Sequence, residues 1–268
     1  MLKIKEYVRV ESLEEAYELN QKKTNRILGG MLWMRMSNVQ IQKGIDLSGL
    51  GLDKIEETDT EFQIGCMVTL RQLELHEGFH KYTNGIARGC VKDIVGVQFR
   101  NLATVGGSIF GRFGFSDVLT AFLAMDSFVE LYKGGIVPLS EFVNMKKDND
   151  ILVRVIVKKH ADERYAYLTH RNTKTDFPVL AVAVMEDKEQ VKVVAGARPH
   201  KAKLVEIDAE VQKKILNSTS VDELKEIAKT LSETVETGSN MRASGEYRTH
   251  LAKVLIGRAF VQLQEERA

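Results

Sequence analysis

The chain has little cysteine and little proline. Of its 268 residues, 2 are Cys and 3 are Pro. Cys66 and Cys90 stand alone in the sequence, so they cannot supply the roughly four ligands that an iron–sulfur cluster or a structural zinc site takes. We interpret them as buried apolar thiols. Because prolines are few and 44% of the residues are hydrophobic, the composition excludes a disordered, low-complexity chain.

An excess of charge of either sign is also missing. Lys and Arg number 38 against 37 Asp and Glu, so the net charge is +1. This balance gives no reason to expect nucleic acid or an anionic membrane as a partner. The longest apolar runs are shorter than the roughly 20 residues of a membrane span. Residues 1–19 are charged throughout and lack the apolar core of a signal peptide. We therefore expect a cytoplasmic protein.

Strands and helices are mixed without regular alternation, which favours an α+β fold over a doubly wound sheet. Two capping boxes, Ser12 with Glu15 and Ser220 with Glu223, predict helix starts. Further helices are expected after Thr69, after Asp117 and over 247–263, and residues 79–98 show helical spacing. Strands are expected at 26–28, 61–68, 103–105, 126–132, 150–157 and 163–172. A strand with a turn is expected within each of 44–50 and 190–200, whereas 177–187 fits either a helix or a strand. We expect 163–172 to pair with 150–157.

Two glycine pairs interrupt apolar stretches of the sequence. The first is in "RILGGMLWMRM" (26–36), and the second is in "NLATVGGSIFGRFGFSDV" (101–118). Glycine pairs after a strand permit positive φ and close approach of a ligand to the backbone, and successive N–H groups there form an anion-binding nest. Two such loops could clamp a diphosphate, although each alone could be only a tight turn. Neither pair fits G-x-G-x-x-G or G-x-x-x-x-G-K-[ST], which argues against Rossmann and P-loop sites.

The order of several segments resembles the FAD-binding subunit of molybdenum hydroxylases, the medium subunit of the xanthine dehydrogenase and carbon monoxide dehydrogenase family. The segments are "LGGMLWMRM", "IDLSGL", "FRNLATVGGSIFGRFGFSDVLTAFLAMDSFVEL", "DILVRVIV" and "SGEYRTHLAKVLIGRAF". The resemblance implies an α+β fold with a two-part, PCMH-type FAD-binding domain and a C-terminal domain of sheet and helices. We expect the first domain at 1–155, with subdomains of about 1–53 and 54–155, and the second at 156–268.

The resemblance also implies which residues hold FAD. The first loop would contact the diphosphate through Leu28, Gly29, Gly30, Met31, Leu32 and Trp33. The second would do so through Ala103, Thr104, Val105, Gly106, Gly107 and Ser108, with the Thr104 hydroxyl and the glycine N–H groups as donors. Asp117 matches an acid that accepts hydrogen bonds from FAD hydroxyls, and Ile94 and Leu152 match apolar contacts. Apart from the resemblance, we expect Asn101 to fix the second loop by bonding to the backbone of that loop.

By this resemblance, the chain is one piece of a heteromer. Electrons would pass from a molybdenum-cofactor large subunit through a [2Fe-2S] small subunit to FAD, and then to NAD or another acceptor. Since the flavin carries the chemistry, we expect neither a catalytic acid or base nor a metal ligand in this chain.

Two alternatives stay open. The family's first loop usually has polar residues where Met31 and Leu32 stand, and a lysine common in relatives is missing near Leu168 and Thr169. The chain could therefore be a divergent, non-catalytic assembly subunit that has lost FAD. The other alternative is an independent flavin oxidase of the broader family that includes vanillyl-alcohol oxidase, although no substrate-binding acid and base are evident.

Overall fold

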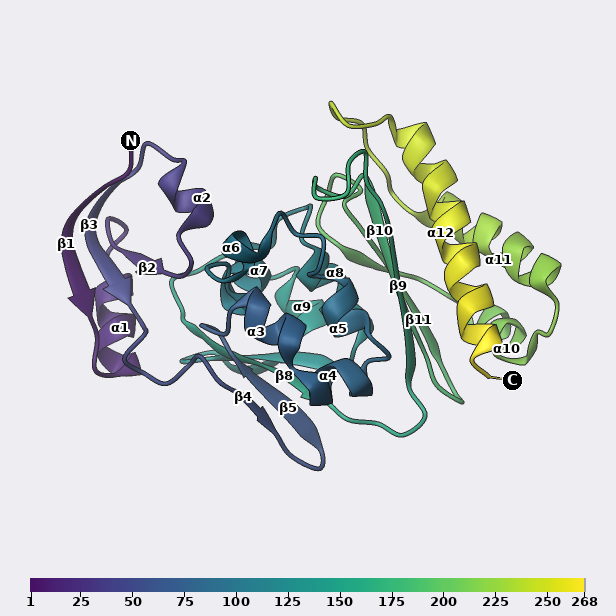
Figure 1. The fold of residues 1–268 in the computed structure, drawn as a ribbon, viewed down its shortest axis with the longest axis horizontal. Helices are drawn as coiled ribbons and strands as arrows, with labels where there is room; N and C mark the ends of the chain where they lie inside the picture. Colours follow the sequence, from purple (N-terminus) through teal and green to yellow (C-terminus); the bar gives the residue numbers. More distant parts are fainter. Residues whose placement is uncertain (268) are drawn as a thin grey trace. The chain divides into compact units, whose positions relative to one another are not determined.

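The computed structural model describes residues 1–267 (Figure 1). The chain forms two compact units that are interleaved in sequence. Unit 1 comprises residues 1–73, 96–111 and 127–158, and unit 2 comprises 74–95, 112–126 and the chain from Lys159 onward. Helix α3 (Leu70–Leu75) contains the first boundary between them. The domain boundary predicted between 155 and 156 stays a prediction.

Unit 1 begins with a small parallel sheet in the order β1-β3-β2. Its strands are β1 (Lys3–Arg9), β2 (Arg26–Leu28) and β3 (Gln40–Asp46), joined by helices α1 (Leu13–Asn20) and α2 (Leu32–Arg35). Ser12 caps α1 by accepting a hydrogen bond from the Glu15 amide at 3.1 Å. The Glu15 carboxylate accepts in turn from the Glu11 amide at 2.9 Å. The strand β2 ends where the first glycine pair begins.

A five-stranded antiparallel sheet forms the rest of unit 1, in the order β4-β5-β8-β6-β7. The strands are β4 (Ile55–Glu57), β5 (Glu61–Gly65), β6 (Ser127–Leu131), β7 (Gly135–Pro138) and β8 (Leu152–Lys158). The short helices of this part are α6 (Val97–Arg100), α7 (Val105–Gly111) and α9 (Leu139–Phe142). Helix α7, which carries the second glycine pair, packs against β5 and β8.

Unit 2 is built on an antiparallel sheet in the order β12-β11-β10-β9. Its strands are β9 (Arg164–His170), β10 (Leu180–Glu186), β11 (Val191–Gly196) and β12 (Lys203–Val205). Helices α10 (Ala209–Asn217), α11 (Val221–Thr234) and α12 (Gly245–Glu265) share one hydrophobic core with this sheet, and α12 lies along it in Figure 1. Helix α8 (Asp117–Ala124) packs against β10 and β11. The remaining helices are α4 (Glu77–Tyr82) and α5 (Ile86–Gly89).

The predicted α+β fold in two parts is confirmed, together with most of the expected elements. Segment 177–187, for which the sequence left two possibilities, forms the strand β10, and all seven of its residues are buried. Burial on both faces explains why its first six side chains are apolar without alternation. Strand β1, with its many charged residues, was not predicted.

Two expectations about secondary structure were wrong, and a third, the helical spacing over 79–98, is confirmed only in part. Strands β8 and β9 do not pair: β8 lies between β5 and β6, and β9 pairs with β10. The helical spacing over 79–98 does not give one helix, because Asn84, Gly85 and Val95 have positive φ and interrupt it. At 103–105 there is no strand, only an isolated bridge between Thr69 and Thr104.

Candidate cofactor site

The first glycine loop presents a row of open backbone donors. Among residues 1–267, the amides of Gly29, Gly30, Met31 and Leu32 donate to no protein acceptor. Met31 has φ 59° and ψ 7°, in the left-handed region, and this reverses the chain between β2 and α2. Consecutive N–H groups in such a turn form a concave site for an anion. The loop can therefore hold a diphosphate through its backbone alone, without polar side chains at Met31 and Leu32.

The second loop is arranged differently, because its amides are already used inside the protein. The Val105 amide donates to the Val68 carbonyl at 2.8 Å, and the Gly106 amide donates to the Cys66 carbonyl at 2.9 Å. The Gly107 amide donates to Thr104 Oγ1 at 3.1 Å. The N–H and the hydroxyl proton of Thr104 have no acceptor among the described residues, so these two donors are available to a ligand. An anion would therefore meet Thr104 here, and not the glycine amides.

The two loops meet within unit 1 at the Thr104 side chain. A Cβ added to Gly29 would lie 3.2 Å from Thr104 Oγ1, and one added to Gly107 would lie 3.0 Å from the same atom. The hydroxyl is thus placed between one glycine of each loop. Since the open amides of the first loop begin at Gly29, Thr104 adds a side-chain donor beside them.

The other glycine of each pair is required by the packing of the chain itself. A Cβ on Gly30 would lie 1.9 Å from the Leu102 carbonyl oxygen. A Cβ on Gly106 would lie 2.5 Å from the Cys66 carbonyl oxygen. Both distances are far below van der Waals contact, so these two positions need glycine whether or not a ligand is bound.

Asp117, the acid expected to accept FAD hydroxyls, lies in unit 2 as the first residue of α8. Its Oδ1 accepts hydrogen bonds from the Tyr167 hydroxyl and from Arg171 Nη2, both at 2.6 Å. Burial raises the pKa of the Asp117 carboxyl, and the neighbouring Arg171 acts in the opposite direction. Neither partner was anticipated, because they lie some fifty residues away in sequence and only the fold of unit 2 brings them to Asp117.

The remaining predicted site residues are spread over both units. In unit 1, Leu28 and Leu152 are buried at the end of β2 and the start of β8, and Trp33 is 40% exposed on α2. Asn101 is the exposed C-cap of α6, and the Ala103 carbonyl accepts from the Leu70 amide. The Ser108 hydroxyl donates to the Thr104 carbonyl at 3.0 Å. Ile94 is half-buried in unit 2.

Among residues 1–267, no group of three or more His, Cys, Asp or Glu side chains could hold a metal ion. Both cysteines are buried and free, and burial raises the pKa of the Cys66 thiol to about 12. No helix in the described part of the chain is both long enough and apolar enough to span a membrane.

Comparison with protein families gives two matches that together cover most of the chain. Residues 2–159 match the FAD binding domain in molybdopterin dehydrogenase. Residues 165–263 match the CO dehydrogenase flavoprotein C-terminal domain. A sequence search of curated proteins found no match.

Solved structures with the same fold include chains of three related enzymes. A chain of quinoline 2-oxidoreductase from Pseudomonas putida 86 is 17% identical, with a TM-score of 0.86 and 97% of each chain covered. A chain of CO dehydrogenase from Oligotropha carboxidovorans is 23% identical, with a TM-score of 0.83 and 98% of each covered. A chain of carbon monoxide dehydrogenase from Hydrogenophaga pseudoflava is 20% identical, with a TM-score of 0.82 and 96% of each chain covered.

Proposed function

The chain belongs to the FAD-binding subunits of the molybdenum hydroxylases, and we propose that it passes electrons from iron–sulfur clusters through FAD to an acceptor outside the chain. FAD is the cofactor of this family. The proposed partners are a large subunit with the molybdenum cofactor and a small subunit with [2Fe-2S] clusters. The finer proposal, a xanthine dehydrogenase-like subunit with NAD as acceptor, rests on the sequence resemblance. The cytoplasmic location stays a prediction from the sequence.

The observation that supports flavin binding most strongly is the row of open amides in the first loop. A diphosphate carries two negative charges, and each N–H bond to it is charge-assisted and contributes about 1.5–3 kcal/mol. The amides of Gly29, Gly30, Met31 and Leu32 are the proposed donors, together with the N–H and hydroxyl of Thr104. Since these groups have no protein acceptor, bound FAD would supply partners that the chain itself does not.

Asp117 is proposed to accept a hydrogen bond from a hydroxyl of FAD. Its Oδ1 already accepts from two protein donors, so Oδ2 is the oxygen available for a further one. Arg171 balances the buried charge of this carboxylate and keeps it an acceptor. Tyr167 fixes its orientation.

Bound FAD supplies two-electron and one-electron redox chemistry, which lets a subunit of this kind join a hydride acceptor to one-electron clusters. The chain's own part is to bind the diphosphate, to orient the flavin and to limit its contact with water. No side chain described above needs to move a proton in this scheme. Substrate contacts would lie on the proposed large subunit.

The decisive experiment is an absorption spectrum of the purified chain, followed by identification of the ligand released on heating. We expect oxidised-flavin bands and release of an equimolar amount of FAD. A folded, colourless chain that also fails to bind added FAD would overturn the proposal and favour the non-catalytic assembly subunit. Substrate-driven bleaching without any partner subunit would instead favour an independent flavin oxidase.

A further inference from the structure

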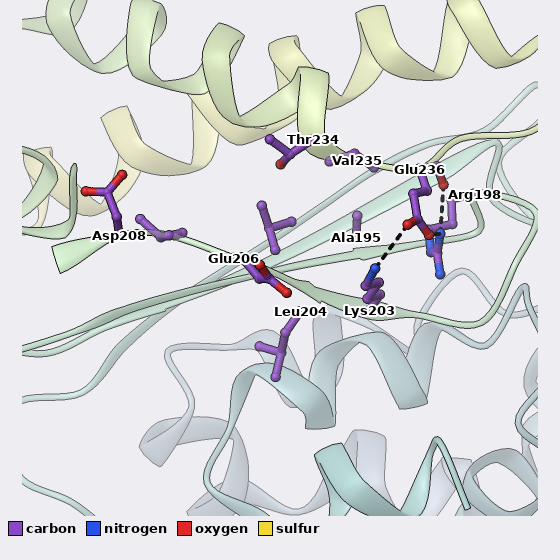
Figure 2. Close-up of a pocket in the computed structure, with 11 residues that line it drawn as sticks. Ala195, Arg198, Lys203, Leu204, Glu206, Asp208, Thr234, Val235 and Glu236 are labelled. Carbon is purple, nitrogen blue, oxygen red and sulfur yellow. Dashed lines mark hydrogen bonds and ion pairs between the residues drawn. The ribbon is translucent and has the colours of Figure 1, made fainter. Parts of the chain in front are cut away.

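Unit 2 contains a groove of about 660 Å³ beside strand β12 (Figure 2). It runs along the segment 203–208 and is closed on its other side by Thr234, Val235 and Glu236, at and just after the end of α11. Asp208 and Arg198 lie at its opposite ends in Figure 2. None of these residues takes part in the proposed flavin site, so the groove calls for a separate explanation.

The edge of β12 along the groove has no neighbouring strand. β12 is the outermost strand of its sheet and pairs only with β11, with Leu204 opposite Val194. Among the described residues, the amides of 203–207 make no backbone hydrogen bond outside that pairing. A strand edge of this kind presents N–H and C=O groups in series, which another extended chain can satisfy and a compact small molecule cannot.

The end of the groove at Arg198 carries two cations, Arg198 and Lys203, that share one exposed acid, Glu236. The Arg198 side chain is 8% exposed, and its guanidinium is held by the carbonyls of Lys201 at 2.8 Å and Glu236 at 2.7 Å. The Glu236 carboxylate, 67% exposed, lies 3.5 Å from Arg198 Nη1 and 3.3 Å from Lys203 Nζ. Strong charge-assisted bonds are about 2.7–2.9 Å long. This acid therefore satisfies the two cations only loosely.

The side chains along the groove define the chemistry of an occupant. The apolar residues that line the groove are Leu204, Val205, Ile207 and Val235. Asp208 lies at the end opposite Arg198, and Glu206 lies between the two ends (Figure 2). A complementary strand has an acidic residue at the Arg198 end, apolar residues in the middle and a basic residue at the other end. A carboxylate so placed would bind Arg198 and Lys203 at shorter range than Glu236 does.

We propose that this groove binds an extended segment of a partner subunit, which adds to the edge of β12 as a further strand and places a carboxylate at Arg198 and Lys203. The proposal rests on the heteromeric assembly proposed above and names the surface of this chain that takes part in it. Main-chain hydrogen bonds would supply the affinity, and the charges at the two ends would set the direction and register of the added strand.

The test is hydrogen–deuterium exchange on the isolated chain and on the complex purified after co-expression with its molybdenum and iron–sulfur subunits. We expect those amides of 203–207 that point away from β11 to exchange at least about tenfold more slowly in the complex, because strand addition gives them acceptors. Exchange at these amides that is the same in the complex as in the isolated chain would overturn the proposal.

Charge reversal at one exposed lysine provides a second readout. Lys203→Glu should weaken association with the partner subunits by about tenfold or more, because the acidic residue of the added strand would then be repelled. Lys213→Glu, on the exposed part of α10 and outside the groove, is the matched control and should associate as the wild type does. Association of Lys203→Glu with unchanged affinity would overturn the proposal.

The FAD content of the chain, measured in the same samples, separates this inference from the proposed function. If the complex assembles with FAD and the edge amides stay unprotected, only the groove proposal fails. If the chain binds no FAD, the proposed function fails whatever happens at β12. If no complex forms, the heteromeric part of the function and the groove proposal fail together.

Discussion

The Nη2 of Arg171 lies 2.6 Å from Oδ1 of Asp117, and the two side chains are only 7% and 5% exposed. A buried carboxylate that loses its cation keeps the desolvation cost without the compensating attraction. This pair therefore gives the first prediction, which concerns the stability of unit 2 and its dependence on pH.

Replacing Arg171 by Met should lower the free energy of unfolding by about 3–5 kcal/mol at neutral pH, because the Asp117 charge is left unbalanced. Burial already raises the pKa of Asp117, and loss of the cation should raise it further. When the pKa of an acid is higher in the folded state than in the unfolded state, the folded protein loses stability as pH rises from the unfolded pKa to the folded pKa. The difference in unfolding free energy between the wild type and Arg171→Met should therefore be smaller near pH 5 than near pH 8.

Denaturant unfolding of Arg171→Met and of wild type at both pH values measures this. Arg171→Lys is the control, since it keeps the charge and should recover part of the loss. An equal deficit at the two pH values would show that the ion pair is not its cause.

Replacing Thr104 by Val should weaken FAD binding by about tenfold or more, since one hydrogen bond to a charged group contributes about 1.5–3 kcal/mol. Thr104→Ser, which keeps the hydroxyl, should bind nearly as well as the wild type. Titration of the apoprotein with FAD, followed by quenching of flavin fluorescence, gives the dissociation constants. If Val and Ser variants bind equally, the hydroxyl does not contact the cofactor.

Changing each glycine of the second pair to Ala should have different effects: Gly106→Ala should lower stability, and Gly107→Ala should lower FAD content. Gly106→Ala places a Cβ 2.5 Å from the Cys66 carbonyl oxygen, and this overpacking should cost about 1–3 kcal/mol of stability with or without FAD. Gly107→Ala has room except at Thr104 Oγ1, 3.0 Å away, so it should reduce FAD content and leave the melting temperature of the apoprotein nearly unchanged. Melting curves of both apoproteins, with their FAD content, test this. Identical behaviour of the two variants would contradict it.

Neither thiol of the native chain should react with Ellman's reagent at pH 8. Burial raises the pKa of Cys66 to about 12 and that of Cys90 further still, so both are protonated at this pH and inaccessible to the reagent. After unfolding in guanidinium chloride, 2 thiols per chain should react. Rapid labelling of the folded protein would show that one of the two sites opens.

Local features of the fold could be predicted from the sequence because they depend on neighbours in the chain. The helix N-caps at Ser12 and Ser220 and a strand close to 150–157 follow from short patterns, and each is present. The pairing of strands was not predictable in this way. Segments 150–157 and 163–172 are close in sequence and both favour strands, but nothing local indicates that β8 and β9 belong to different sheets.

At the candidate site, the sequence indicated the two glycine loops but not the reason for each glycine. Gly30 and Gly106 are needed by contacts with Leu102 and Cys66, which are made through backbone atoms and leave no trace in residue type. The use of the Val105, Gly106 and Gly107 amides within the protein also depends on which carbonyls lie nearby in space. The ion pair of Asp117 with Arg171 joins distant parts of the sequence for the same reason.

The complete burial of α8 has a consequence for how the chain is made. Every residue of this helix is buried, and it packs on β10 and β11, which are synthesised well after it. A ribosome that adds about 5–20 residues per second needs several seconds to extend the chain from Ala124 to Gly196. During that time a nascent chain holds an apolar helix without its sheet. The growing polypeptide should therefore depend on chaperones most strongly in this interval, and ribosome stalling there should cause aggregation.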